Sequence, residues 1–95
     1  MLLPLSAATL AKQAADTLRR YILSRDLREG AELPSERDLS ESLSVSRNIV
    51  REALTTLMVE GMIIKKPGCG IFVSAFDRRM AMARVRTNIA AIGYS

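Results

Sequence analysis

The chain has 95 residues, which is enough for one small domain with a modest hydrophobic core. Its 48% hydrophobic and 25% charged residues are typical of a globular chain and exclude an intrinsically disordered one. No apolar run approaches the roughly 20 residues that a membrane-spanning helix needs, so the sequence excludes a membrane protein.

The net charge of +4 is unevenly distributed along the chain. Residues 1–75 contain ten Lys and Arg against nine Asp and Glu, which gives +1. Residues 76–95 contain four arginines against one aspartate, which gives +3. Because the first segment is nearly neutral overall, nucleic-acid binding by it would depend on where particular cations point.

Cysteine and histidine usage excludes several classes of site. The single Cys69 cannot form an internal disulfide, which is typical of the reducing cytoplasm, and the N-terminus lacks the basic start of a signal peptide. The absence of histidine excludes Ser–His and Cys–His nucleophile pairs and any zinc site that uses histidine. We therefore predict that the chain is not an enzyme and that it holds no cofactor or metal.

The first predicted element is an amphipathic helix over roughly 6–24. Charged residues such as Asp16 and Arg19 lie between its apolar positions and are predicted on its polar face. A turn at 28–31 and a short strand at Glu32 and Leu33 follow. The apolar residues of the helix recur at three- and four-residue steps: Leu10, Ala14, Leu18, Tyr21 and Ile22.

A second, short helix is predicted from Ser35 to about Leu43. Ser35 is a good N-cap, and the helix dipole favours Glu36 and Asp38 in the first turn. Residues 44–46 form a short break before the next helix.

A third helix is predicted over roughly 47–60, with Ser46 as its N-cap. Gly61 is a natural left-handed residue to end it. Its predicted buried stripe consists of Val50, Ala53, Leu54, Leu57 and Met58.

A β-hairpin is predicted after the third helix. The apolar, β-branched segments 62–66 and 70–74 flank a Pro-Gly-Cys-Gly turn at 67–70. The complete order therefore predicts a mainly α fold with a small β-hairpin: three helices that form the core, and two strands.

The third helix carries the strongest functional pattern. Arg47, Asn48, Arg51 and Thr55 form a polar stripe opposite the buried one, and it begins at the N-terminal turn. In helix-turn-helix proteins this turn meets base edges in the major groove, where Arg can grip guanine and Asn can grip adenine with two bonds. The alternative is a solvated helix face, with Arg51 paired to a nearby glutamate.

Other cations have two possible roles as well. Arg37, near the start of the second helix, can bind a phosphate or pair with Glu41, four residues on. Lys65, Lys66 and Gly68 mark a basic hairpin tip, which can reach a phosphate or the minor groove. The two lysines can equally protect an exposed strand edge from aggregation.

Three segments of the chain carry short motifs: 33–39 (LPSERDL), 45–54 (VSRNIVREAL), and the continuation 60–63 (EGMI) with 68–73 (GCGIFV). In their order and spacing these motifs resemble the signature of the GntR family of bacterial transcriptional regulators, and the resemblance covers about residues 10–73. It implies a winged helix-turn-helix in a metabolite-responsive regulator that binds a palindromic operator in double-stranded DNA as a homodimer. The third helix would lie in the major groove and a wing over 62–74 would lie on the backbone or minor groove.

The resemblance also implies which residues contact DNA. Relatives usually have Arg where this chain has Lys65 and Lys66, which keeps the charge but loses the bidentate fork. The predicted DNA-binding residues are Arg37, Ser46, Arg47, Asn48, Arg51, Lys65, Lys66 and Gly68.

We expect residues 1–76 to form the DNA-binding domain and 77–95 to be a linker and the start of a truncated effector-binding and dimerising region; the alternative is a stand-alone module. A small-molecule effector would act only through that missing C-terminal domain. The apolar residues of 77–95 are expected to fold back on the winged helix or to pair with a second copy: Met80, Met82, Val85, Ile89 and Ile92.

Two further functions stay open for the same fold. A winged helix used only for protein contact would have a neutral or acidic recognition face on its third helix. The basic residues Arg47 and Arg51 on that face disfavour this function. A regulator whose C-terminal half resembles an aminotransferase would bind a cofactor in a region outside this sequence.

Overall fold

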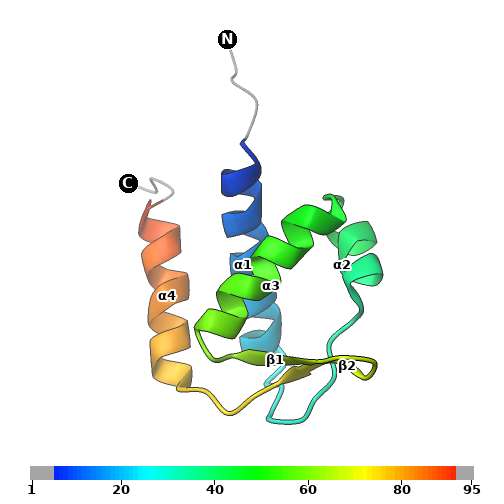
Figure 1. Cartoon of the computed structure of the whole chain (residues 1–95). Helices are drawn as coiled ribbons and strands as arrows, with labels where there is room; N and C mark the ends of the chain where they lie inside the picture. Colours follow the sequence, from blue (N-terminus) through cyan, green and yellow to red (C-terminus); the bar gives the residue numbers. More distant parts are fainter. Residues whose placement is uncertain (1–5, 92–95) are drawn as a thin grey trace.

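The computed structural model describes residues 6–91, with their side chains through Val85. The elements follow the predicted order of helices and hairpin, with boundaries within about two residues of the predicted ones (Figure 1). They are α1 (Ala7–Ser24), α2 (Glu36–Leu43), α3 (Arg47–Val59), β1 (Ile63–Lys66), β2 (Gly70–Val73) and α4 (Arg78–Ala91).

A serine precedes each of the first three helices and caps it. The Ser6 hydroxyl accepts from the backbone N–H of Thr9 at 3.1 Å, and Ser35 and Ser46 accept in the same way three residues along the chain. Each bond satisfies one N–H that has no partner inside the helix, and such a cap contributes about 1 kcal/mol. The caps predicted at Ser35 and Ser46 are confirmed.

Two left-handed residues set the entry and exit of α3. Ser44, with φ of 56°, turns the chain between α2 and α3, and the Ser40 hydroxyl donates to the Val45 carbonyl at 2.5 Å across this turn. Gly61, with φ of 79°, ends α3 as predicted, and the Met62 N–H donates to the Leu57 carbonyl at 3.0 Å. This αL geometry is common at helix ends and directs the chain into the hairpin.

The hairpin is antiparallel and is tied to the connection between α1 and α2. Lys66 lies opposite Gly70 at its closing end. Along the outer edge of β2, the Leu33 N–H donates to the Ile71 carbonyl and the Val73 N–H donates to the Ala31 carbonyl, both at 2.8 Å. The short strand predicted at Glu32 and Leu33 is present as a single bridge to Phe72.

The core lies where α1, α3 and the base of the hairpin meet, and α3 crosses α1 (Figure 1). The predicted buried stripe of α3 is confirmed except at Met58, which is only partly buried at the edge of the stripe. Ile49, on the opposite edge, is buried instead. The largest fully buried side chains are Ile22, Val50, Leu54, Leu57, Met62, Ile63 and Val73.

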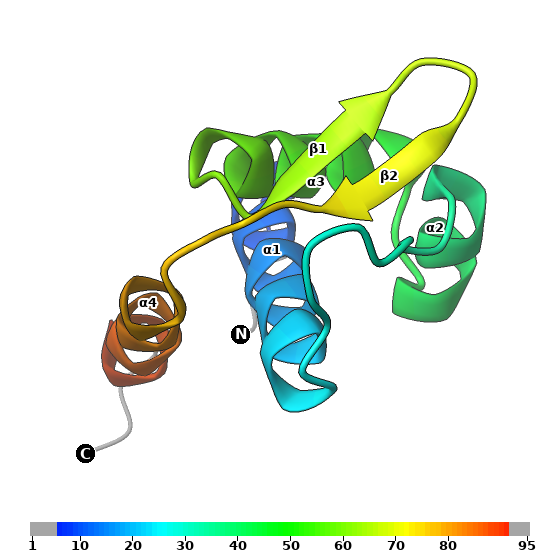
Figure 2. The same ribbon diagram turned by 90° about the horizontal axis from the view of Figure 1, so that it is seen from below.

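Helix α4 lies beside α1, at the opposite side of the molecule from α2 and the hairpin tip (Figures 1 and 2). Ala81 and Val85 are buried, whereas Met80 and Met82 are exposed. Of the two arrangements expected for this segment, the described part therefore folds back on the domain. The side chain of Ile89 and the whole of Ile92 lie outside the described residues. Within residues 6–91, no helix has both the length and the apolarity to cross a membrane.

Candidate nucleic-acid interface

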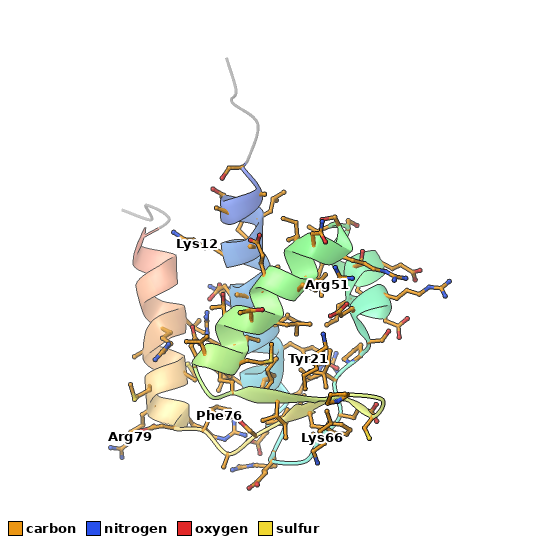
Figure 3. The ribbon with its side chains drawn as sticks, viewed as in Figure 1. Lys12, Tyr21, Arg51, Lys66, Phe76 and Arg79 are labelled. Atoms are coloured by element: carbon orange, nitrogen blue, oxygen red, sulfur yellow. The ribbon has the colours of Figure 1, made fainter. Side chains whose placement is uncertain are left out.

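The first two turns of α3 present polar side chains to solvent. Ser46, Arg47, Asn48, Arg51 and Thr55 are all exposed, as the helical spacing predicts, because the opposite stripe is buried in the core. Figure 3 shows Arg51 on this outer face of α3, above the hairpin that carries Lys66. An exposed N-terminal turn with Arg and Asn is the arrangement that reads base edges in the major groove.

Arg51 is held by two neighbours rather than extended freely into solvent. Its Nε–H donates to Glu36 Oε1 at 3.2 Å, and its Nη1–H donates to Asn48 Oδ1 at 3.1 Å. The pairing with a nearby glutamate, considered from the sequence as an alternative to DNA contact, is therefore present. This pairing and the bond to Asn48 use only the Nε and Nη1 donors of the Arg51 guanidinium, which has five N–H donors in all. Its Nη2 donors can therefore still hydrogen-bond to a base.

Glu36 also binds the hairpin. Lys65 Nζ donates to Glu36 Oε2 at 2.6 Å, so this carboxylate joins α2, α3 and β1. The hydrogen bond from Lys65 lowers the pKa of Glu36 below its ordinary value, the bond from Arg51 adds to this, and partial burial opposes it. The sequence alone identifies Glu36 only as a carboxylate in the first turn of a helix. No local pattern predicts that it binds Arg51 and Lys65, which lie 15 and 29 residues further along the chain.

Arg37 extends from the exposed side of α2. Its Nε lies 3.5 Å from Glu41 Oε1, which confirms the predicted ion pair, and both side chains are exposed. Exposed pairs of this kind contribute only tenths of a kcal/mol. Arg37 can therefore leave Glu41 for a phosphate at little cost.

The hairpin tip combines a lysine with a glycine turn. Lys66 Nζ lies 5.2 Å from the centre of the Phe72 ring, within range of a cation–π contact. Gly68 has φ of 75° with open space around it, so the backbone geometry rather than packing demands glycine. The structure thus brings Asn48, Arg51 and Lys65 together around Glu36, while Lys66 and Arg37 keep partners of their own.

A second charged cluster lies at the other end of α3, and its α1 residues are buried although they are predicted on a polar helix face. Arg19 and Asp16, predicted on the polar face of α1, are buried. Arg19 donates to both oxygens of Glu60, from Nε at 3.0 Å and from Nη2 at 2.8 Å, and its Nη1 donates to Asp16 at 3.3 Å. Arg84 of α4 pairs with the same Glu60 at 3.2 Å, so this cluster joins α1, α3 and α4.

The sequence comparisons agree with this geometry. The profile of the family described as "Bacterial regulatory proteins, gntR family" matches residues 10–73. A protein of Escherichia coli (strain K12), provisionally named as the regulator of the L-lactate dehydrogenase operon, is 42% identical over 64 residues, covering 67% of this chain and 25% of its own length. The transcriptional repressor NagR of Bacillus subtilis (strain 168) is 39% identical over 62 residues, covering 65% and 26%. The chain thus spans about a quarter of these relatives.

Solved structures show the same fold. The GntR protein of Streptococcus agalactiae superposes with a TM-score of 0.63 at 37% identity, over 68% of this chain and 32% of that one. The DNA-binding domain of AraR, solved in complex with its operator ORX1, superposes with a TM-score of 0.67 at 25% identity, over 78% and 92%. These matches confirm the predicted winged-helix fold class.

Proposed function

Because the chain belongs to the GntR family and carries the winged helix-turn-helix of a DNA-binding transcriptional regulator, we propose that it recognises a specific operator through α3 and the hairpin. The observation that carries this proposal is the exposed polar turn of α3 beside a basic hairpin, on a helix whose opposite stripe is buried. The function is binding rather than catalysis, in the cytoplasm, where operators are found.

The proposal gives each cation a role. Arg47 and Arg51 recognise guanines in the major groove, and Asn48 recognises an adjacent base. Ser46 and Arg37 contact phosphates near the N-termini of α3 and α2, since helix N-termini offer free N–H groups. The hairpin contacts the DNA backbone or the minor groove through Lys65, Lys66 and the turn at Gly68.

We further propose that the functional unit is a homodimer on a palindromic operator. A single helix-turn-helix covers one half-site, and operator symmetry mirrors the two-fold axis of the protein. Linking two half-sites adds roughly 10²–10⁴ in affinity, so the 95-residue chain alone should bind weakly and with strong salt dependence. An effector would act through a C-terminal domain outside this sequence.

The proposed boundary between the DNA-binding domain and the following region lies after Phe76. It is supported by the start of a new helix there, since the Asp77 carboxylate accepts from the N–H groups of Arg79 at 2.9 Å and Met80 at 3.3 Å. Residues 77–95 would then connect the winged helix to the effector-binding region.

Selection from a pool of random duplexes tests the proposal. The 95-residue chain should enrich one sequence motif, and two copies fused to a dimeric coiled coil should enrich its inverted repeat. Enrichment of no motif by either protein would contradict sequence-specific recognition.

A further inference from the structure

Glu36 occupies an unusual position for an acidic residue in a DNA-binding surface. Glu36 lies in the first turn of α2, between α3 and the hairpin, and its side chain is 19% exposed. An acidic group on such a surface repels phosphates. Its place among the DNA-facing cations therefore calls for a physical explanation.

The two oxygens of the carboxylate serve different elements. Oε1 accepts from Arg51 Nε on α3, and Oε2 accepts from Lys65 Nζ on β1. Together with the bond to Asn48, this holds the Arg51 guanidinium from two sides and leaves its Nη2 edge outside both bonds. An arginine ordered before binding loses less rotamer freedom when it meets a base, so the contact becomes tighter and more directional.

The carboxylate also reduces the attraction of this surface for DNA of any sequence. Arg51 and Lys65 together carry two positive charges, and Glu36 cancels one of them at hydrogen-bond distance. Attraction by phosphates is independent of sequence and follows the number of cations that a protein offers. Directional hydrogen bonds from a held Arg51 still discriminate between bases.

We propose that Glu36 is a specificity-determining positioning residue: it orients Arg51 for base contact and, by pairing with Lys65, weakens the sequence-independent attraction of this surface for phosphates. The proposal rests on the proposed function and deepens it. It predicts that a carboxylate at this position weakens binding to DNA in general while it increases the ratio between specific and non-specific affinity.

Three variants of the 95-residue chain separate the two effects. Glu36→Gln removes the charge at nearly the same size, and Glu36→Asp keeps the charge but is too short by one methylene to hold both partners. Glu41→Gln is the matched control, because it removes from the same helix a carboxylate that pairs with the exposed Arg37 on α2 instead of with α3 or the hairpin in the described residues.

Affinities are measured by fluorescence anisotropy on the duplex selected by the wild-type chain and on a scrambled duplex of the same composition, at several salt concentrations. Glu36→Gln should bind the scrambled duplex several-fold more tightly, with a salt slope steeper by about one unit. Its ratio of specific to non-specific affinity should fall roughly tenfold. Glu36→Asp should lose discrimination without the steeper slope, and Glu41→Gln should keep the wild-type ratio.

A measurement without DNA keeps the proposal testable if binding is weak. The Nε–H of Arg51 should give a sharp, slowly exchanging NMR signal in the wild-type chain and lose it in Glu36→Gln, with amide signals elsewhere unchanged. An unchanged affinity ratio in Glu36→Gln, or an unchanged Arg51 signal, overturns the proposal. If the wild-type chain itself selects no sequence, the proposed function fails, and this inference fails with it.

Discussion

The two ends of α3 use the same chemistry in opposite surroundings. Near its N-terminal half, Glu36 holds Arg51 and Lys65, whose side chains are 56% and 47% exposed. At its C-terminal end, Glu60 holds Arg19, whose side chain is only 3% exposed. In both places one carboxylate joins three elements.

Burial decides what each cluster does. Exposed ion pairs contribute about 0–1 kcal/mol, so the pairs of Glu36 with Arg51 and Lys65 contribute little to the stability of the fold, and both cations stay accessible to DNA. Removing one partner of a buried pair costs about 3–5 kcal/mol, because it leaves an uncompensated charge. The Glu60 cluster therefore stabilises the fold and fixes α4, while the Glu36 cluster remains available for binding.

The largest expected effect comes from breaking the buried cluster. Arg19→Met should destabilise the domain by about 3 kcal/mol or more, since Glu60 and Asp16 lose their buried partner. Urea unfolding followed by circular dichroism measures the change. Arg20→Met is the matched control, because Arg20 pairs with Asp16 from a side chain that is 45% exposed. Equal losses in both variants would mean that burial does not distinguish them.

Substitution of Arg51 should affect binding and leave folding nearly intact. Arg51→Ala should weaken binding to the selected duplex by about 1–3 kcal/mol and relax the preference at one base pair. Its free energy of unfolding should change by less than about 0.5 kcal/mol, as for other exposed sites. Equal losses on selected and scrambled duplexes would reduce Arg51 to a phosphate contact.

Removal of the hairpin lysines should act on all DNA alike. Lys65→Ala together with Lys66→Ala should lower the salt slope of binding by about one to two units on any sequence. Lys12→Ala on α1 is the control, since this exposed lysine lies far from the hairpin (Figure 3). An unchanged slope in the double variant would place the hairpin outside the DNA contact.

The smallest expected effect is the pH dependence of the Glu36 cluster. Because folding lowers the pKa of Glu36, its ion pairs stabilise the fold fully above the ordinary value of 4.5, and this contribution disappears as the pH falls through the lower folded value. The stability difference between the wild-type chain and Glu36→Gln should therefore shrink between pH 6 and pH 3. A difference that is constant over this range would mean that the carboxylate charge does not contribute.

Local patterns predict the fold well because its determinants are local. Serine caps, the left-handed Gly61 and the apolar stripe of α3 are each set by neighbours within a few residues. Local patterns do not predict the charged clusters, because their partners are distant in sequence. Arg19, for example, donates to Glu60, which lies 41 residues further along the chain. Helical periodicity places Arg19 on a polar face, and only the packing of α3 and α4 against α1 turns that face inward.

The candidate interface likewise combines features that local sequence patterns predict with one that they do not. The exposed residues of α3 and the pair between Arg37 and Glu41 follow from spacing along a helix. The bridging role of Glu36 depends on how the hairpin approaches α2, which no short pattern in the chain specifies. The connection that holds β2 against residues 31–33 sets this approach.

An NMR titration of the 95-residue chain with its selected duplex tests the central claim most directly. The largest changes in amide chemical shift should fall on the start of α2, on residues 46–55 and on the hairpin tip, while Glu60 and α4 change little. Largest changes on the face that α1 and α4 form would contradict the account, because they would place the DNA at the buried cluster instead.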